Sequence, residues 1–339
     1  MRWQNLAVET EERARLPGYR DEAIVRHFDA PGAIETRFYE VRAKSILNRV
    51  PEASRMPFRW TINPYRGCSH ACVYCFARPT HAYLDFDIGR GFEREIVVKV
   101  NAPELLRAEL ARPSWQKEHV ALGTNTDPYQ WVEGRYKLMP GIWEAMRDAA
   151  NPCSVLTKSP LLLRDLSLMK EIAERTEFSA ALSVPTLDER AWRATEPHTP
   201  NPRARLEAVA ELARAGIRTG VLIAPLMPGI NDSPEQVARI LELASEVGAA
   251  YITGIALHLR GELKGLFSDW LQASRPDLVP RYRQLYRRGA YVPVAERERL
   301  AQLVAGSDAA PGERTRGRVF DPAPATSERR KEVVQTTLF

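Results

Sequence analysis

Between residues 58 and 260 the sequence alternates six times between a short apolar segment and a longer amphipathic one. The apolar segments are five to nine residues long and mostly rich in Val, Ile, Leu and Ala, which is typical of strands buried on both faces. The amphipathic segments carry apolar residues at helical spacing, as residues 203–215 do before the stop signal at Gly216. This alternation predicts a parallel sheet that is covered by helices.

The predicted strands lie at 58–63, 119–123, 154–158, 178–184, 219–226 and 251–259. Six β/α units are too few for a complete eight-stranded barrel, so we expect an α/β fold of the partial (β/α)6 TIM type. Residues 95–100 form a further apolar segment, which we assign to an extra edge strand. In the helix predicted over 159–175, Ser159 is the expected N-cap and Pro160 takes the first helical position.

The segments on either side of this core differ from it in composition. Residues 1–57 are polar and broken by Pro and Gly, so we expect an extended N-terminal arm with short helices. Residues 261–307 are expected to form a helical C-terminal extension to the core at 58–260. Residues 308–339 are rich in Ala, Pro, Gly, Arg and Ser, which predicts a flexible basic tail.

Three of the four cysteines, Cys68, Cys72 and Cys75, lie within eight residues in the spacing C-x3-C-x2-C. Such a segment offers three thiolates from one tight loop, and thiolates are the usual ligands of iron–sulfur clusters. Three of them can hold three irons of a [4Fe-4S] cube and leave the fourth iron open to a small chelating cofactor. A low cysteine count and an oxygen-sensitive cluster both suit a reducing compartment.

This motif, with the aromatic Tyr74 before its last cysteine, resembles the signature of radical SAM enzymes. The string NPYRGCSHACVYCFARPTHAYLDF, followed later by GTNTDPYQWVE and LTKSPLLLRDL, is similar to the subgroup related to spore photoproduct lyase. The resemblance extends over about residues 40–260. It implies a partial barrel, a [4Fe-4S] cluster on the three cysteines, and S-adenosylmethionine (SAM), which the reduced cluster cleaves to a 5'-deoxyadenosyl radical.

Two other uses of the cysteines are open at this stage. A zinc site would need a fourth ligand, for which His70 and His81 are candidates, and would make the protein a zinc-stabilised nucleic-acid-binding module without catalysis. The paired C-x2-C units of zinc knuckles are absent from the sequence. Disulfides would leave one of three neighbouring cysteines unpaired, and the charged N-terminus shows no export signal.

Ligands of parallel α/β barrels meet the carboxyl ends of the strands, and this rule selects the remaining site candidates. We expect SAM to contact Tyr74, Gly123, Thr124, Asn125, Asp127, Lys158 and Ser183. The family usually places a Gly-Gly-Glu element after the second strand to bind the methionyl amino group. Here GTNTD stands in its place, so Asp127 is the candidate for that role, and an Asp-Pro turn is its structural alternative.

Other residues at strand ends could likewise either bind a ligand or have a structural role. Lys158 could hold a carboxylate or phosphate, or form a structural ion pair, and Ser183 could contact the ribose or cap a turn. Residues 224–232 resemble the apolar segment that packs the adenine in such enzymes. Glu196 lies in a loop after the fourth strand, and the sequence assigns it no role.

The resemblance also raises the question of a hydrogen-atom donor, because spore photoproduct lyases use an extra cysteine for this step. The remaining cysteine, Cys153, precedes the third strand and so lies at the wrong end of the barrel, where we expect it to be a packing residue. Tyr129 and Tyr83 are the alternative candidates, and nothing in the sequence selects between them.

Charge and a terminal motif bear on the substrate. Residues 275–299 hold seven arginines against three acids, and residues 312–331 hold six basic residues against three acids; such stretches contact phosphate or form a solvated surface. The terminal peptide resembles the Q-x-x-L-F motif that binds the bacterial sliding clamp, with Gln335, Leu338 and Phe339 as the contact residues. Both features favour DNA as the substrate.

The sequence therefore predicts a radical SAM enzyme that acts on DNA in a lyase-like lesion-repair or related base-modifying reaction. The same chemistry on RNA, a peptide or a metabolite is the alternative. Such an enzyme needs an electron donor, for example flavodoxin or ferredoxin. No apolar run approaches the roughly 20 residues of a membrane span, so we expect a cytoplasmic protein without a membrane partner.

Overall fold

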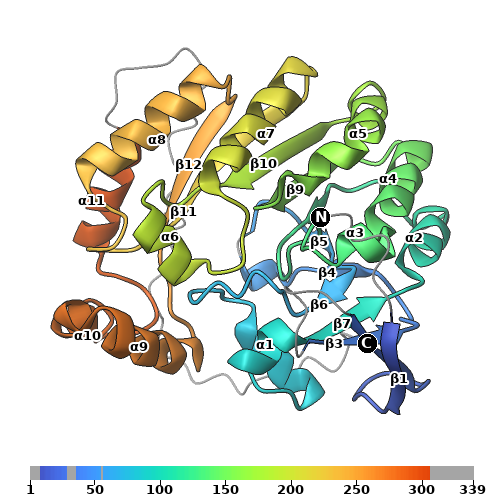
Figure 1. Cartoon of the computed structure of the whole chain (residues 1–339). Helices are drawn as coiled ribbons and strands as arrows, with labels where there is room; N and C mark the ends of the chain where they lie inside the picture. Colours follow the sequence, from blue (N-terminus) through green and yellow to red (C-terminus); the bar gives the residue numbers. More distant parts are fainter. Residues whose placement is uncertain (1–7, 29–35, 55, 306–339) are drawn as a thin grey trace.

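A computed structural model describes residues 8–28, 36–54 and 56–305, which form two sheets surrounded by helices (Figure 1). The larger sheet has the strand order β12–β11–β10–β9–β8–β5–β4. Its strands are β4 (Leu47–Arg49), β5 (Trp60–Ile62), β8 (Val120–Leu122), β9 (Cys153–Thr157), β10 (Phe178–Ser183), β11 (Arg218–Leu226) and β12 (Tyr251–Ala256). All neighbours from β5 to β12 are parallel, and β4 runs antiparallel to β5. The predicted α/β fold with six parallel strands in an incomplete barrel is confirmed.

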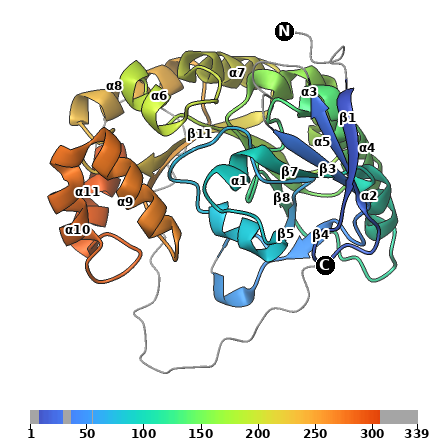
Figure 2. The ribbon, with the colours of Figure 1, turned by 60° about the horizontal axis from the view of Figure 1, so that its bottom comes forward.

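Helices pack along the outer face of this sheet (Figures 1 and 2). They are α2 (Ala102–Leu110), α4 (Leu138–Ala149), α5 (Leu166–Ala173), α7 (Pro202–Arg214), α8 (Pro234–Glu246) and α11 (Val294–Ala305). Their apolar sides share one core with the strands, in which Leu212 of α7 and Ile240 of α8 belong to the same cluster as Ile223 of β11. The expected N-cap is present, because the Ser159 hydroxyl accepts the Leu161 N–H at the start of a 3-10 helix, η4 (Pro160–Asp165), that precedes α5.

The second sheet corrects two predictions. It has the order β1–β2–β3–β7–β6, with β1 (Val8–Ala14), β2 (Ala23–Phe28), β3 (Arg37–Val41), β6 (Tyr65–Arg66) and β7 (Glu95–Lys99). The described part of residues 1–57 consists mainly of paired strands where the sequence predicts short helices, and its one helical segment is the short η2 (Glu52–Ser54). The segment 95–100 is not an edge strand, since β3 and β6 pair with β7 on both sides. The central residues of β7 are fully buried, which explains its unbroken apolar run.

Further helical elements complete the described architecture. They are α1 (Arg90–Arg94), α3 (Glu133–Tyr136), α6 (Glu189–Thr195), α9 (Leu263–Ser274), α10 (Val279–Leu285), η3 (Arg78–Leu84) and η5 (Pro276–Leu278). The helices α9 and α10 lie together at one side of the molecule (Figure 1) and belong to a separate apolar cluster that includes Cys72 and Tyr74.

No helix within the described ranges is long and apolar enough to cross a bilayer. The basic tail and the terminal peptide with Gln335, Leu338 and Phe339 lie outside the described residues.

Candidate functional site

The three clustered cysteines lie on a loop, residues 67–76, that follows β5 and the short strand β6 and is called the cysteine loop here. It begins at Gly67, where φ is +84° and an added Cβ would lie 2.9 Å from the Phe92 carbonyl oxygen, so only glycine fits. The Cys68 N–H donates to that same carbonyl over 2.9 Å. The loop is therefore fixed at its start by backbone contacts with α1.

A buried arginine fixes the middle of the cysteine loop. Arg78, which is 4% exposed, donates from Nε to the Cys72 carbonyl and from Nη2 to the Ala71 carbonyl, each over 3.0 Å. Its Nη1 donates to the Gly89 carbonyl over 2.6 Å. Because carbonyl oxygens inside a protein need donors, this guanidinium stabilises the curved backbone between the cysteines. The sequence reasoning did not select Arg78.

The thiols themselves are shielded from solvent. Cys68 and Cys72 are buried and Cys75 is half-buried. Burial raises the pKa of all three thiols, that of Cys72 to about 12, and neighbouring thiolates raise the pKa of Cys68 and Cys72 further. Buried thiols that repel one another once ionised are held as thiolates by a cationic metal group. The residues present therefore fit an iron–sulfur cluster.

The two candidate fourth ligands of a zinc site have other partners. His70 Nδ1 lies 3.3 Å from Asp127 Oδ2, and His81 Nε2 lies 2.8 Å from the Glu95 carbonyl oxygen. Among the residues that the structure describes, no three His, Cys, Asp or Glu side chains converge to hold one ion. A zinc site needs such convergence, whereas the thiolates of an iron–sulfur cube bind different irons and stand further apart.

The segment after β8, residues 123–127, supports the cysteine loop. At Gly123 φ is +85° and a Cβ would lie 1.8 Å from the Leu156 carbonyl oxygen, so this position requires glycine. The Thr124 hydroxyl and the Asn125 N–H both donate to Asn63 Oδ1, over 3.4 and 3.2 Å. The neighbouring Thr126 hydroxyl donates to the Gly67 carbonyl over 2.7 Å. The predicted GTNTD site thus lies against the start of the cysteine loop.

Asp127 is occupied by protein donors. Its Oδ1 accepts the Thr157 hydroxyl over 2.6 Å and the Tyr129 N–H over 2.9 Å, while Oδ2 accepts the Lys158 N–H over 2.8 Å and faces His70. Burial alone would raise the pKa of Asp127, but the imidazole of His70 and these hydrogen bonds lower it to about 2. A carboxylate has about four acceptor positions, and here all are used. Asp127 therefore ties the β8 and β9 strand ends to the cysteine loop.

Lys158 and Ser183 meet at the carboxyl ends of β9 and β10. Lys158 Nζ donates to Ser183 Oγ over 3.0 Å and lies 3.7 Å from Glu196 Oε1. It also lies 5.8 Å from the centre of the Tyr74 ring. Burial would lower the pKa of Lys158, but the Glu196 carboxylate, together with the Cys72 thiolate and Asp127, raises it above its usual value. Because its side chain is still 17% exposed, this ammonium can reach a ligand.

Glu196 and Arg205 form a buried ion pair next to Lys158 and Ser183. Both side chains are 0% exposed, and Arg205 Nη2 lies 2.7 Å from Glu196 Oε2. The Tyr74 hydroxyl donates to the same carboxylate, and Arg205 Nη1 donates to the Ser183 carbonyl over 2.9 Å. The sequence offered one signal for this pair, an arginine on the apolar face of α7 beside Leu206 and Val209, which are buried.

The three candidate hydrogen-atom donors lie in different surroundings. Tyr129 is fully buried, and its hydroxyl donates to Asp165 Oδ2 over 2.9 Å and accepts the Trp143 Nε1–H over 2.6 Å. Tyr83 lies on η3 and is 64% exposed. Cys153 is the fully buried first residue of β9, at the amino end of the sheet. No described hydrogen bond joins the side chain of any of the three to Lys158 or to the cysteine loop, although the Tyr129 backbone N–H donates to Asp127.

Comparison with known proteins agrees with this geometry. The sequence profile of the radical SAM superfamily matches residues 62–248. The chain is 46% identical over 347 residues to an uncharacterized protein of Mycobacterium tuberculosis, and the match covers 100% of both chains. It is 25% identical over 193 residues to the radical SAM Nalpha-GlyT isomerase of Pseudomonas phage M6, covering 56% of this chain and 37% of that protein.

A solved structure has the same fold. Spore photoproduct lyase complexed with dinucleoside spore photoproduct matches with a TM-score of 0.58 and 16% identity, over 79% of this chain and 78% of the lyase. The profile covers more than half of the chain, including all three clustered cysteines. The chain therefore belongs to the radical SAM superfamily and is an enzyme of that superfamily.

Proposed function

We propose that this radical SAM enzyme binds a [4Fe-4S] cluster through Cys68, Cys72 and Cys75 and acts on DNA in a lyase-like or related base-modifying reaction. The observation that carries the cluster assignment is the placement of three buried thiols on one clamped loop at the carboxyl ends of parallel strands. When bound, such a cluster supplies the electron that cleaves SAM and so initiates radical chemistry on a substrate.

The residues around the loop have separable roles in this proposal. Lys158 is suited to the carboxylate of SAM, because it is a partly exposed cation held by Ser183 and Glu196. Ser183 and Tyr74 complete that side of the site. Gly123, Thr124 and Asn125 offer backbone and polar groups on the other side.

Asp127 is a positioning residue in this proposal rather than a ligand of the methionyl amino group. Its four acceptor positions are filled by protein donors from the segment after β8, from the carboxyl end of β9 and from the cysteine loop. The amino group of SAM must then be bound by other oxygens of the 123–126 segment.

DNA is favoured as the substrate by two independent features. The structural neighbour with the same fold holds a dinucleoside photoproduct, and the arginine-rich stretch 275–299 lies next to the cysteine loop through α9 and α10. The terminal residues Gln335, Leu338 and Phe339 would recruit the enzyme to the sliding clamp. The electron would come from a donor such as flavodoxin or ferredoxin.

The test is anaerobic reconstitution with iron and sulfide, followed by reduction in the presence of SAM. The wild-type protein should bind about four irons with sulfide and release 5'-deoxyadenosine, more of it when damaged DNA is added than when RNA of the same sequence is added. Cys72→Ala should lose both properties. Cys153→Ala is the matched control, since it removes a thiol far from the loop, and it should keep both. A protein that binds zinc without sulfide would refute the proposal.

A second test concerns the partner. The full-length protein should retain the purified sliding clamp on a pull-down resin, and a variant without residues 335–339 should not. Equal retention by both proteins would remove the clamp from the proposal and leave the cluster assignment unaffected.

A further inference from the structure

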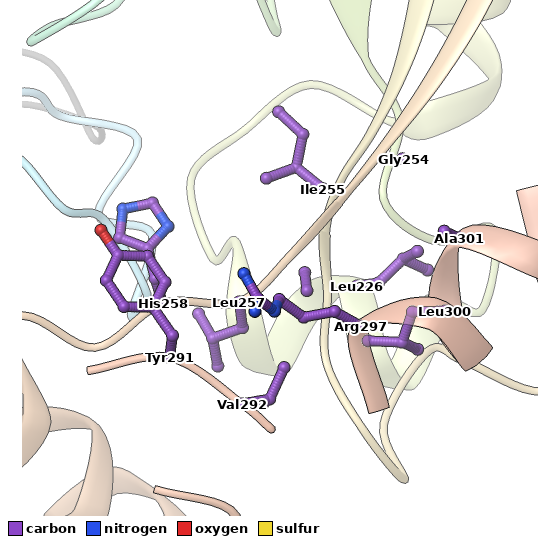
Figure 3. A pocket seen from close by; sticks show the side chains of 11 residues that line it. Leu226, Gly254, Ile255, Leu257, His258, Tyr291, Val292, Arg297, Leu300 and Ala301 are labelled. Atoms are coloured by element: carbon purple, nitrogen blue, oxygen red, sulfur yellow. The ribbon is translucent and has the colours of Figure 1, made fainter. Parts of the chain in front are cut away.

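Three aromatic rings stand in a row beside the cysteine loop. Phe76 directly follows Cys75, and its ring centre lies 5.8 Å from that of His258, which in turn lies 5.8 Å from that of Tyr291. The His258 and Tyr291 rings are inclined by only 26°, and Figure 3 shows them face to face at one end of a surface pocket. Phe76 is 49% exposed, so this aromatic row ends in a half-exposed ring next to Cys75.

The backbone on both sides of the aromatic row is fixed. The Leu259 N–H donates to the Ala290 carbonyl over 2.8 Å, and the Tyr286 hydroxyl donates to the Leu257 carbonyl over 2.9 Å. These bonds hold the segment after β12 against the turn after α10. Rings that are already ordered lose little conformational entropy when a flat ligand stacks on them.

Two effects keep the central ring of the row uncharged near neutral pH. Burial and the nearby guanidinium of Arg260 lower the pKa of His258 below its usual value. A neutral imidazole between Phe76 and Tyr291 can then contribute to stacking as an aromatic surface.

One cation contacts the aromatic row, and others lie near it in the sequence. The Arg260 guanidinium lies 5.2 Å from the centre of the Tyr291 ring and donates to its hydroxyl. Three more exposed arginines follow on α10 and the turn after it, Arg283, Arg287 and Arg288. Within the part of the chain that the structure describes, their guanidinium groups have no hydrogen-bond or ion-pair partner.

Arginines on the same stretch that do have partners make the contrast clear. Arg299 is paired with Asp232 and Glu296, and Arg281 lies 3.3 Å from Glu296. The unpaired arginines are therefore not a consequence of missing acids on this surface. Unpaired cations on the segment that leads to Tyr291, together with the half-exposed Phe76 ring, suit a ligand with both phosphates and flat bases.

We propose that the aromatic row and the arginines beside it bind an unpaired stretch of a DNA strand, with bases stacked on the rings and phosphates contacted by the guanidinium groups. This inference rests on the proposed DNA substrate and adds where and in which state the strand is held. An enzyme that modifies a base must take it out of the duplex stack, and the row would receive the exposed bases directly beside Cys75. Phe76 lies inside the superfamily match at 62–248, whereas His258, Tyr291 and the arginines lie beyond it.

The experiment measures equilibrium binding of short dye-labelled oligonucleotides to the reconstituted full-length protein by fluorescence anisotropy. The probes are a DNA single strand, its duplex and an RNA of the same sequence, at salt concentrations between about 50 and 200 mM. The variants are Arg287→Ala/Arg288→Ala, Tyr291→Ala and Tyr291→Phe. The matched control is Arg20→Ala/Arg175→Ala, which removes the same charge from exposed positions elsewhere.

The single strand should bind more tightly than the duplex or the RNA. The Arg287→Ala/Arg288→Ala variant should bind about tenfold more weakly, and its slope of log K against log salt should fall by about 0.7 for each lost phosphate contact. Tyr291→Ala should also lose about tenfold, while Tyr291→Phe keeps the stacking surface and most of the affinity. The control should bind as wild type, and all variants should keep the wild-type iron content.

Equal weakening in the control and the arginine variant, tighter binding of duplex or RNA, or no binding of the single strand would each overturn the inference. The outcome is separable from that of the proposed function, because binding requires neither reduction nor SAM. If strand binding fails while 5'-deoxyadenosine still forms with damaged DNA, only the aromatic-row assignment is lost. If binding behaves as described while no 5'-deoxyadenosine forms, the catalytic proposal fails instead.

Discussion

Charged side chains are paired inside the protein at the cofactor end of the barrel, but several are left unpaired on the α10 surface. Around the cysteine loop, Asp127 and Glu196 each have several protein partners and are buried. On α10 and the turn after it, Arg283, Arg287 and Arg288 are exposed, with no partner among the described residues. Charges that are satisfied internally hold a geometry, whereas charges left unpaired at a surface are available to another molecule.

Burying the charges of Asp127 and Glu196 costs desolvation free energy. Their hydrogen bonds and ion pairs offset this cost only while every partner is present. A buried carboxylate that loses its cation, or a guanidinium that loses its carboxylate, becomes an unpaired charge in a poor solvent. The second arrangement carries little such cost, because water solvates the exposed guanidinium groups. The four predictions below test this difference.

The largest effect is expected at Glu196. Replacing Glu196 by Ala leaves the fully buried Arg205 without its carboxylate, and the free energy of unfolding should fall by about 3–5 kcal/mol. Denaturant unfolding followed by circular dichroism measures the change. Glu189→Ala is the matched control, since Glu189 is 71% exposed and pairs with Arg193 at the surface, and it should cost less than about 1 kcal/mol. Equal losses in the two variants would contradict the contrast.

The next effect depends on pH. The pKa of Asp127 is about 2 in the folded protein and about 3.9 in an unfolded chain. Asp127 therefore adds about 2–3 kcal/mol of stability above roughly pH 4, and this contribution is lost as the pH falls toward 2. The free energy of unfolding of Asp127→Asn should lie below that of wild type at neutral pH, and the gap should shrink in acid. Asp269→Asn, at an exposed position, should show no such gap, and a gap for Asp127→Asn that does not vary with pH would refute this account.

A smaller effect is expected at Lys158. Replacing this partly exposed cation by Met should weaken SAM binding to the reconstituted protein about tenfold, or about 1.4 kcal/mol, without changing the iron content. Equilibrium dialysis under anaerobic conditions measures the dissociation constant. Lys170→Met, on the exposed side of α5, should bind SAM as wild type does. An unchanged constant for Lys158→Met would assign this lysine a purely structural pairing with Glu196.

The smallest effect is expected for the salt dependence of DNA binding, in a comparison of two arginines on α10. Arg283→Ala removes an unpaired guanidinium and should reduce the salt slope of single-strand DNA binding by about 0.7. Arg281→Ala removes a guanidinium that already lies 3.3 Å from Glu296, so it should leave the slope nearly unchanged. Anisotropy titrations over a range of salt give both slopes. A larger change for Arg281→Ala would reverse the assignment of the two arginines.

The parallel sheet was predictable because each of its strands is a local apolar run. Segments such as 154–158 and 178–184 lie within one or two residues of β9 and β10. The second sheet was not predictable, because most of its strands are partly polar. In addition, β3 pairs with β7, which lies more than 50 residues further along the sequence. Local patterning carries no signal for such a pairing.

The candidate site shows the same limit. The cysteine spacing and the strand-end rule were sufficient to select Lys158 and Ser183, which the structure places 3.0 Å apart. Partners that depend on the folded chain were not accessible in this way. The buried pair of Glu196 and Arg205 joins a loop to α7, and neither residue is unusual among its sequence neighbours until both are seen to be buried.

The account depends most directly on the state of the cysteine loop when metal is supplied. Electron paramagnetic resonance of the reconstituted and reduced protein, recorded before and after addition of SAM, tests it in one experiment. The account predicts the spectrum of a reduced [4Fe-4S] cluster that changes when SAM is added and is absent from Cys72→Ala. A folded wild-type protein that gives no cluster spectrum, or one that SAM leaves unaltered, would contradict it.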